Sequence, residues 1–530
     1  MEYIEIIVSK DEVVDRGVEP DIVQRVNDKY EIWYFKKERV PPLSIQQYSY
    51  SVIPKCLMPL SNEALQDSGV LKLQNNPTLS LKGQGVFIAI IDTGVQITDN
   101  YNIYSIWDQN GMQNPPEGFF YGTEYRDGQI DELYTGDSDG HGTYVASVAA
   151  GKTDLQNDFT GAAPEAELIV VKLRPASEML KEFYYIPNDR VVYSEADIML
   201  AVAYADEIAT RENRPLVICL ALGCNNGLHV GSGALSDYLS SIATKIHRAV
   251  VIGAGNEANQ RKHYSAITDS VLVSDKVEIE VTNQMRGFYI EFWSPAPDLY
   301  AVSLQSPTGA VRPQSMPVAG VSGEYEYAVD DSRAIIDYRY VGRSRRDQLI
   351  SIRIDNPSKG IWTLMVYTQN NINGSFNIWL PMKRMMYADV NFIRPNPDST
   401  FTMPGDSKVA MTVGGYNQIT NALYLDSGRG FAPDGGVKPD FLAPAVEIKG
   451  LGLRGQYISV TGTSAATAIT AGACAQLLEW AVVRGNAIGI NSVDIKNLLI
   501  RGTRKSDNIS YPNEEYGYGI MDVYESFRLI

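Results

Sequence analysis

The chain has 530 residues, of which 44% are hydrophobic and 21% are charged, as in an ordinary globular protein. This length allows two to four domains, and the composition excludes a chain that is disordered throughout. The net charge of −17 argues against nucleic acid and anionic lipid as partners, because their phosphate groups would be repelled. The sequence contains no run of 18 consecutive apolar residues, so no membrane span is predicted. The N-terminus has no basic or long apolar region, so we expect no signal peptide and a protein that stays inside the cell.

Residues 1–60 predict a small unit of their own. Apolar residues alternate with polar ones at Ile4–Val8, which is typical of a half-buried strand, and Ile32–Phe35 predicts a second strand. Several prolines between Pro41 and Pro59 then indicate irregular, extended sequence. We therefore expect a small α+β domain that ends in an extended tail.

Residues 61–270 and 401–530 alternate between strand and helix patterns. Their strands are apolar at almost every position, as in a parallel sheet covered on both faces, and lie at 86–91, 168–171, 216–220, 249–252 and 409–413. Helical patterns lie at 194–211, at 235–248 and from about 465. This alternation predicts one α/β domain with a doubly wound parallel sheet.

Residues 271–400 have a different pattern and interrupt that domain. Eight short runs rich in Val, Ile, Tyr, Phe and Trp predict strands at 276–281, 288–294, 299–305, 324–329, 333–341, 348–354, 361–368 and 374–380. Strands without helices predict an inserted β-sandwich or jelly-roll module. It has no cluster of catalytic or metal-binding residues, so we expect it to stabilise the α/β domain by packing against it.

Cysteine and histidine are rare in this chain. The four cysteines, which are Cys56, Cys219, Cys224 and Cys474, include no CxxC pair and therefore predict neither a zinc site nor a redox motif. We expect reduced, buried thiols, no bound metal and no cofactor. Any mechanism that needs a histidine must use one of four residues, which are His141, His229, His247 and His263.

Three short segments carry candidate chemistry, although each has a simpler structural interpretation when taken alone. Asp92 follows a buried strand and could be a turn residue, while His141 opens a helix of small residues. Ser464 opens an apolar helix and could be a helix cap. Together they supply an acid, a base and a hydroxyl nucleophile. A serine needs a base to remove its proton, and a carboxylate orients that base.

A fourth segment supplies a stabilising group for such a reaction. Gly253–Asn256 follows the strand that ends at Ile252. Asn256 is by itself an ordinary turn residue, but its side-chain N–H groups could donate to the oxyanion that forms when Ser464 attacks a carbonyl. The N–H groups at the start of the Ser464 helix could contribute to the same charge.

With these four segments the chain resembles the subtilisin-like serine protease family. Further matches are Ala221, Leu222 and Gly223, where the family lines its substrate cleft, and Lys438-Pro439-Asp440. The resemblance covers residues 65–270 and 400–525 and implies a protein substrate. It implies that Asp92, His141 and Ser464 form the catalytic triad, that Asn256 is the oxyanion donor, and that the other three histidines are structural.

The chain departs from the family pattern at three places. Ala468 stands four residues after Ser464 where the family usually has proline, and Ala221 stands where it usually has serine. Neither change touches the chemistry that the resemblance implies. The calcium-loop residues of secreted relatives are not recognisable, so no metal site is expected.

The β insertion, the short N-terminal domain and the missing signal peptide resemble one branch of the family, the Csp germination proteases of anaerobic spore-formers. That resemblance implies a cytoplasmic or spore-associated enzyme that activates a cortex-lytic hydrolase. It also implies that residues 1–60 are a propeptide, cut between about residues 55 and 63 by Ser464 and then retained in the cleft. Two alternatives stay open: an intracellular subtilase with another processing or turnover role, and a non-catalytic signalling pseudoprotease. The three intact triad residues favour an active enzyme.

Overall fold

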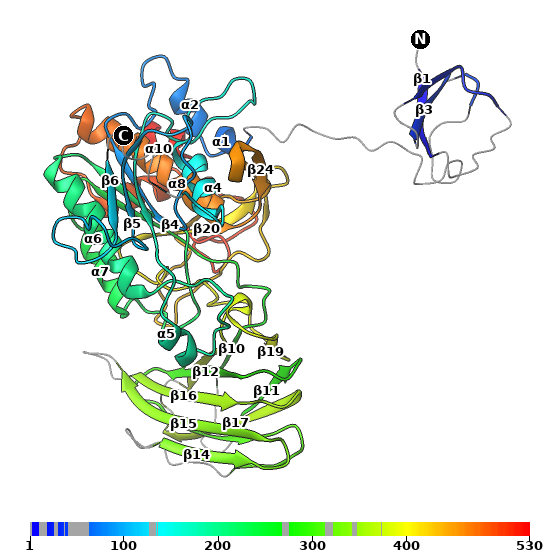
Figure 1. Cartoon of the computed structure of the whole chain (residues 1–530), viewed down its shortest axis with the longest axis vertical. Helices are drawn as coiled ribbons and strands as arrows, with labels where there is room; N and C mark the ends of the chain where they lie inside the picture. The colour runs from blue at the N-terminus through cyan, green and yellow to red at the C-terminus, as the bar shows by residue number, and fades with distance from the viewer. Residues whose placement is uncertain are drawn as a thin grey trace. The chain divides into compact units, whose positions relative to one another are not determined.

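The computed structural model describes residues 3–9, 18–25, 30–36, 38–40, 63–126, 134, 136–267, 275–312, 322–341, 347–370, 372 and 374–530. The chain divides into two compact units, Met1–Pro59 and Leu60–Ile530, which we describe separately (Figure 1). The domain boundaries expected near residues 60, 270 and 400 stay predictions.

The first unit contains a three-stranded antiparallel sheet. Its order is β1-β3-β2, with β1 at Tyr3–Ser9, β2 at Ile22–Arg25 and β3 at Tyr30–Lys36. The two predicted strands are present. The sequence pattern missed β2, which is short and leaves Ile22 and Val23 about half exposed. The extended tail expected at 52–60 lies outside the described residues.

The second unit is built on a mixed sheet of nine strands. Eight of them follow in the order β21-β20-β9-β8-β4-β7-β5-β6, and β22 pairs with β20. The strands are β4 (Phe87–Asp92), β5 (Ile103–Asp108), β6 (Thr123–Arg126), β7 (Glu167–Lys172), β8 (Leu216–Leu220), β9 (Arg248–Gly253), β20 (Met411–Asn417), β21 (Ala422–Leu423) and β22 (Phe441–Pro444).

The predicted parallel sheet has an antiparallel strand at each of its two edges. The inner strands pair in parallel, but β6 runs antiparallel to β5, and β21 runs antiparallel to β20. The β20–β21 connection is a tight turn, because the Asn417 side chain accepts the N–H groups of Ile419 and Thr420. Such a turn reverses the chain and joins antiparallel neighbours.

Helices cover both faces of this sheet. Ile88 and Ile90 of β4 join one core with α4 and α8, while Phe87, Ala89 and Ile91 join the opposite core with α6 and α7. The helices of this unit are α1 (Glu63–Asp67), α2 (Val70–Gln74), α4 (His141–Ala150), α5 (Glu178–Phe183), α6 (Glu195–Arg211), α7 (Ala234–Ala243), α8 (Thr463–Leu478), α9 (Ser492–Arg501) and α10 (Val523–Arg528). A two-stranded ribbon, β23 (Ile448–Leu451) with β24 (Tyr457–Val460), packs beside α4.

The helix α8 and the π-helical turn Glu479–Val483 that follows it form one long apolar helix. By length and composition the combined stretch, Thr463–Val483, could cross a membrane. However, 83% of its most apolar window is buried inside the protein, as expected for the central helix of a folded core.

A module of two antiparallel sheets lies between β9 and β20. One sheet has the order β10-β18-β12-β16-β15-β14 and the other the order β13-β17-β11-β19 (Figure 1). Side chains of both sheets meet in one core. The strands are β10 (His263–Ile267), β11 (Asp275–Val281), β12 (Gly287–Ser294), β13 (Leu299–Gln305), β14 (Ser322–Tyr327), β15 (Ser332–Val341), β16 (Asp347–Asp355), β17 (Gly360–Asn370), β18 (Ser375–Trp379) and β19 (Val390–Phe392). All eight predicted strands are present, and β10 and β19 add two that the pattern did not indicate.

Two side chains of β12 hold the segment that follows β8. The Tyr289 hydroxyl donates to Oδ1 of Asn226 at 2.8 Å. The carboxylate of Glu291 accepts the Asn226 amide and the Gly227 backbone N–H, both at 2.8 Å. The module therefore fixes a loop of the α/β domain through charge-assisted hydrogen bonds.

Trp379 of β18 lies at the centre of the same interface. Its ring stacks on His229 at 4.2 Å and on His263 at 4.9 Å between centroids, and all three side chains are buried. Burial lowers the pKa of both histidines to about 4. The interface thus contains two imidazole rings that are neutral at pH 7.

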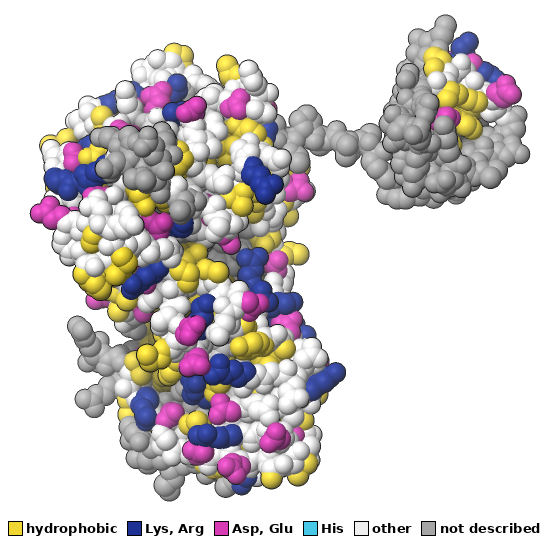
Figure 2. All heavy atoms as spheres, viewed as in Figure 1, with side chains coloured by type: hydrophobic (Ala, Val, Ile, Leu, Met, Phe, Trp, Pro, Cys, Tyr) yellow, Lys and Arg dark blue, Asp and Glu magenta, His cyan; other side chains and the backbone are white. Residues whose placement is uncertain are grey.

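The exposed face of the module carries mixed charge. Figure 2 shows Lys and Arg side chains interspersed with Asp and Glu over its strands. Several pair directly, such as Lys276 with Glu278 at 2.7 Å and Arg339 with Asp337 at 3.1 Å. On the face drawn, no continuous basic stripe is present that could follow a phosphate backbone.

We predict that acid weakens this interface through His229 and His263. In the unfolded chain their pKa returns to about 6.5, so below that pH the unfolded state binds more protons than the folded state. The free energy of unfolding should fall between about pH 6.5 and pH 4, by up to about 3 kcal/mol per histidine. Urea unfolding of a Ser464→Ala chain at several pH values measures this slope.

The variant His229→Phe keeps an aromatic ring in the stack but cannot bind a proton. It should unfold with a shallower pH slope over the same range, whatever its stability at pH 7. His247→Asn, at a partly exposed position with positive φ, controls for the loss of an imidazole. A His229→Phe slope equal to that of the parent would contradict the prediction.

Candidate active site

Asp92 is the last residue of β4 and lies at the carboxyl end of the sheet. It is 1% exposed, and its Oδ1 accepts the N–H of Thr93 at 2.7 Å. In open α/β sheets this edge is where functional groups gather. The buried strand therefore places a carboxylate at the rim and restricts its orientation.

His141 is the first residue of α4 and meets Asp92 directly. Its Nδ1 lies 2.8 Å from Oδ1 and 2.9 Å from Oδ2 of that carboxylate. The preceding Gly140 has φ of 99°, a conformation that glycine adopts readily. A Cβ at Gly142 would lie 2.2 Å from the Gly94 carbonyl oxygen, so only glycine lets the helix start come this close to β4.

Ser464 is the second residue of α8, and its Oγ lies 3.0 Å from Nε2 of His141. Asp92, His141 and Ser464 thus form a continuous chain of hydrogen bonds, although Ser464 is 323 residues from His141 in sequence. This distance lies within the range for a nucleophile and its base.

The surroundings of His141 favour its protonated form. Burial by itself lowers the pKa of the imidazole, but the charge and hydrogen bond of Asp92, with Asp139 and Asp137 nearby, raise the pKa above its ordinary value of 6.5 overall. A ring of this kind accepts a proton from a hydroxyl more readily than a free histidine does.

Asn256 lies beside the start of α8. Its Oδ1 accepts the N–H of Thr463 at 3.0 Å, so the two N–H groups on Nδ2 remain on the other side of the amide. A Cβ at Gly462 would lie 3.5 Å from that Nδ2. The amide donors therefore lie next to the helix turn that carries Ser464.

Ala221, Leu222 and Gly223 continue from β8 as a partly exposed segment on the same edge of the sheet. The next residue, Cys224, exchanges two backbone hydrogen bonds with Met403, at 3.0 and 2.8 Å. This pairing holds the backbone at the end of the segment in place against Met403.

Sequence reasoning missed Asp137, which holds the loop that precedes His141. Its carboxylate is buried and accepts the N–H groups of Asp139, Gly140 and Thr143 and the Thr143 hydroxyl. It therefore fixes the loop that leads into α4 and accepts one N–H group of the first helical turn, that of Thr143. Its position three residues before the Gly-His-Gly segment is the signal that could have identified it.

The other predicted site residues have other surroundings. His229 and His263 are buried in the module interface, and His247 contacts the Ile488 carbonyl. Cys219, Cys224 and Cys474 are free thiols whose pKa is raised by burial, and Cys56 lies outside the described residues. Among the residues that the structure describes, no group of three or more His, Cys, Asp or Glu is arranged to hold a metal ion.

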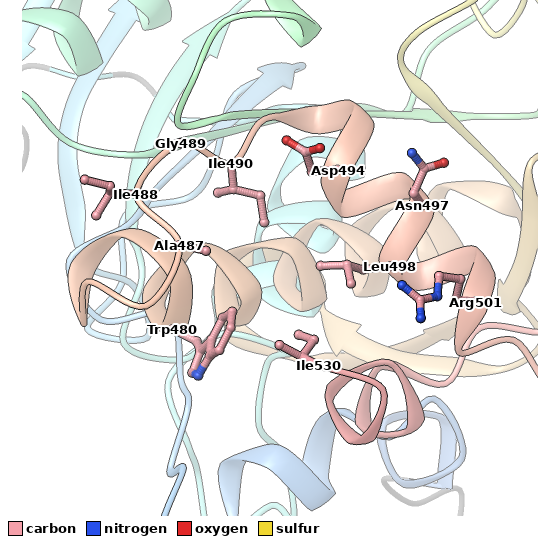
Figure 3. Close-up of a pocket in the computed structure, with 10 residues that line it drawn as sticks. All are labelled: Trp480, Ala487, Ile488, Gly489, Ile490, Asp494, Asn497, Leu498, Arg501 and Ile530. Atoms are coloured by element: carbon pink, nitrogen blue, oxygen red, sulfur yellow. The ribbon is translucent and has the colours of Figure 1, made fainter.

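A cavity of about 490 Å³ lies elsewhere, between α9 and the C-terminus (Figure 3). Its apolar lining includes Trp480, Ile488, Ile490, Leu498 and Ile530. Polar groups of α9 also line it: Asp494, Asn497 and Arg501. None of the predicted site residues lines it, so we give it no part in the chemistry.

The chain is similar to known proteins in sequence and in fold. A model of the peptidase S8 group, described as the subtilase family, matches residues 83–305 and 363–519. A subtilisin from Bacillus sp. (strain TA39) is 28% identical over 192 residues, which are 36% of this chain and only 38% of that protein. The structure of the Clostridium perfringens CspB protease superposes with a TM-score of 0.78 at 24% identity, covering 88% of this chain and 97% of that one, so the two share a fold.

We predict that the reactivity of Ser464 depends on the protonation of His141. A protonated imidazole cannot accept the hydroxyl proton, so fluorophosphonate labelling of Ser464 should slow as pH falls through the raised pKa of His141. Asp139→Asn removes one charge that raises this pKa and should move the midpoint of the labelling curve to lower pH. Labelling rates measured from pH 5 to pH 9 test both statements.

Asp189→Asn is the matched control, because Asp189 is an exposed acid that the surroundings of His141 do not include. Its midpoint should equal that of the unmodified chain. Asp92→Asn should slow labelling on the order of 10⁴-fold, because the imidazole loses the partner that fixes its tautomer. Equal midpoints for Asp139→Asn and the unmodified chain would disprove the electrostatic argument.

Proposed function

This chain belongs to the subtilase family, and we propose that it is an active serine endopeptidase that uses Asp92, His141 and Ser464 as its catalytic triad. The observation that supports the proposal is the hydrogen-bonded chain from Asp92 through His141 to Ser464, at 2.8 and 3.0 Å. A pseudoprotease that had lost one of these three residues could not form this chain of hydrogen bonds.

The proposed reaction begins with attack of Ser464 Oγ on the carbonyl carbon of the scissile peptide bond. His141 takes the hydroxyl proton on Nε2, while Asp92 holds the proton on Nδ1 and stabilises the imidazolium that forms. The carbonyl electron pair moves to oxygen and gives a tetrahedral oxyanion. When the intermediate collapses, the C–N bond breaks and His141 delivers its proton to the leaving amine; water then repeats the sequence to release the acyl group.

In this proposal the oxyanion is stabilised by Asn256. The amide oxygen is occupied by the N–H of Thr463, which leaves Nδ2 to donate toward the reacting carbonyl. The first N–H groups of α8 have no acceptor within the helix and add positive potential at the same place. Such donors act most strongly on the charge of the transition state.

We further propose that the physiological role is processing of one protein substrate during spore germination, namely activation of a cortex-lytic hydrolase zymogen. Support comes from the fold shared with the CspB protease over 88% of this chain and 97% of that one. The corresponding location is the cytoplasm or the spore. A different intracellular processing or turnover role is the alternative, and a genomic neighbourhood without a cortex-lytic hydrolase would favour it.

Residues 1–60 are proposed to act as a propeptide that assists folding and then occupies the substrate cleft. The first unit has its own sheet, with Val8 and Phe35 buried, and is compact by itself. The proline-containing sequence that follows is suited to an extended conformation, which could add to the cleft as a strand.

Asn256→Ala should retain the fold and reduce kcat by roughly 10²–10³, because one oxyanion donor is lost. The rate of peptide hydrolysis per active site, with active sites counted by fluorophosphonate titration, measures the effect. Asn226→Ala removes a hydrogen-bonded amide from the module interface instead and controls for a general loss of rigidity. Unchanged kinetics in a folded Asn256→Ala protein would remove Asn256 from the site.

Purified wild-type protein should give two fragments on a denaturing gel, from one cut between residues 55 and 63, and a single species on gel filtration. Ser464→Ala should give one uncut chain, because the chain's own nucleophile makes the cut. If Ser464→Ala is cut as the wild type is, another protease processes the chain and autoprocessing is wrong.

A further inference from the structure

Two glycines near the proposed nucleophile face the same threonine side chain. A Cβ added to Gly223 would lie 2.3 Å from Oγ1 of Thr402, and one added to Gly255 would lie 2.5 Å from Cγ2 of Thr402. Both contacts are far below van der Waals distance. The Thr402 side chain therefore fills the space between the two backbone segments that carry these glycines.

Hydrogen bonds hold Thr402 in this position from both sides. Its N–H donates to the carbonyl of Ala254 at 2.9 Å, which is the neighbour of Gly255. The following residue, Met403, exchanges two backbone hydrogen bonds with Cys224, which is the neighbour of Gly223. Thr402 is also 1% exposed. The backbone of Thr402 thus cannot withdraw to enlarge the space.

The proposed mechanism brings one substrate residue to these glycines, and the following step rests on that mechanism. A carbonyl attacked by Ser464 has its oxygen at the Asn256 amide, so the residue that carries this carbonyl lies next to Gly255. In the proposed complex a substrate strand pairs with Ala221–Gly223, so the same residue lies between this segment and Gly255. Its side chain then faces the space that Thr402 fills.

We propose that Thr402 limits the size of the substrate residue on the acyl side of the scissile bond, so that the enzyme accepts glycine, alanine, serine or cysteine there and rejects large side chains. The hydroxyl and methyl groups of Thr402 occupy the volume that a longer side chain would need. Because backbone hydrogen bonds hold Thr402 between the two glycines, such a side chain has no space.

The proposal narrows the expected position of the propeptide cut. The sequence from residue 55 to 63 is Lys-Cys-Leu-Met-Pro-Leu-Ser-Asn-Glu. Only Cys56 and Ser61 in this stretch satisfy the size limit. The new N-terminus should therefore follow one of these two residues, and a cut after Leu57, Met58 or Leu60 would contradict the proposal.

The decisive experiment compares matched peptides that carry alanine or phenylalanine at the acyl position. Wild type should cleave the alanine peptide at least about tenfold faster by kcat/KM, and Thr402→Gly should raise the phenylalanine-to-alanine ratio at least about tenfold. Thr402→Val keeps the size without the hydroxyl and should keep the wild-type preference.

Thr400→Gly is the matched control, because this nearby buried threonine donates to the Pro397 carbonyl and is not among the nearest neighbours of a Cβ at either glycine. Its ratio should equal that of wild type, and the ratio does not depend on the folded fraction. A wild-type enzyme that prefers phenylalanine, or a Thr402→Gly ratio equal to that of Thr400→Gly, overturns the proposal. Absent fluorophosphonate labelling of Ser464 would instead reject the proposed endopeptidase itself.

Discussion

The close approach of α4 to the end of β4 is the constraint on which the site depends. The Gly142 N–H donates to Oγ1 of Thr93 at 2.9 Å, and no side chain would fit between Gly142 and the Gly94 carbonyl. The backbones of α4 and of the segment after β4 are therefore held together within a few residues of Asp92 and His141. This contact brings the Asp92 and His141 side chains within hydrogen-bond distance. The small residues of α8 then let that helix pack closely against α4; a Cβ at Gly472, for example, would lie 2.9 Å from the carbonyl oxygen of Ala149. This packing brings Ser464 to the imidazole.

The sequence allows much of this arrangement to be predicted, because its determinants are local. Asp92, His141, Asn256 and Ser464 each lie where a strand ends or a helix begins, and the glycines around them indicate close backbone approach. The buried strands of the central sheet are apolar at nearly every position, which no exposed segment of comparable length would be. The strands of the inserted module were predictable for the same reason, since alternation of buried and exposed residues is a property of a few consecutive positions.

What the sequence does not reveal depends on partners that are distant in the chain. The antiparallel edge strands β6 and β21 are short and only partly buried, so no pattern of their own distinguishes them. Thr402 belongs to an irregular segment after the module, and its importance appears only when Gly223 and Gly255 are seen on both sides of it. The stack of Trp379 between His229 and His263 likewise joins three segments that no local rule connects.

The placement of the module between two adjacent strands also bears on how the chain folds. Met411 of β20 pairs with Val251 of β9, yet the entire module lies between them in sequence. Closing so long a loop costs conformational entropy before the hydrogen bonds between the two strands form. Contacts between residues far apart in sequence also slow folding. The module has its own core and can form first, which brings the two ends of the loop together because the Asn396 N–H donates to the His263 carbonyl. This topology favours an order of assembly in which the module forms first and β20 pairs second, so that Thr402 and the start of α8 join the site late.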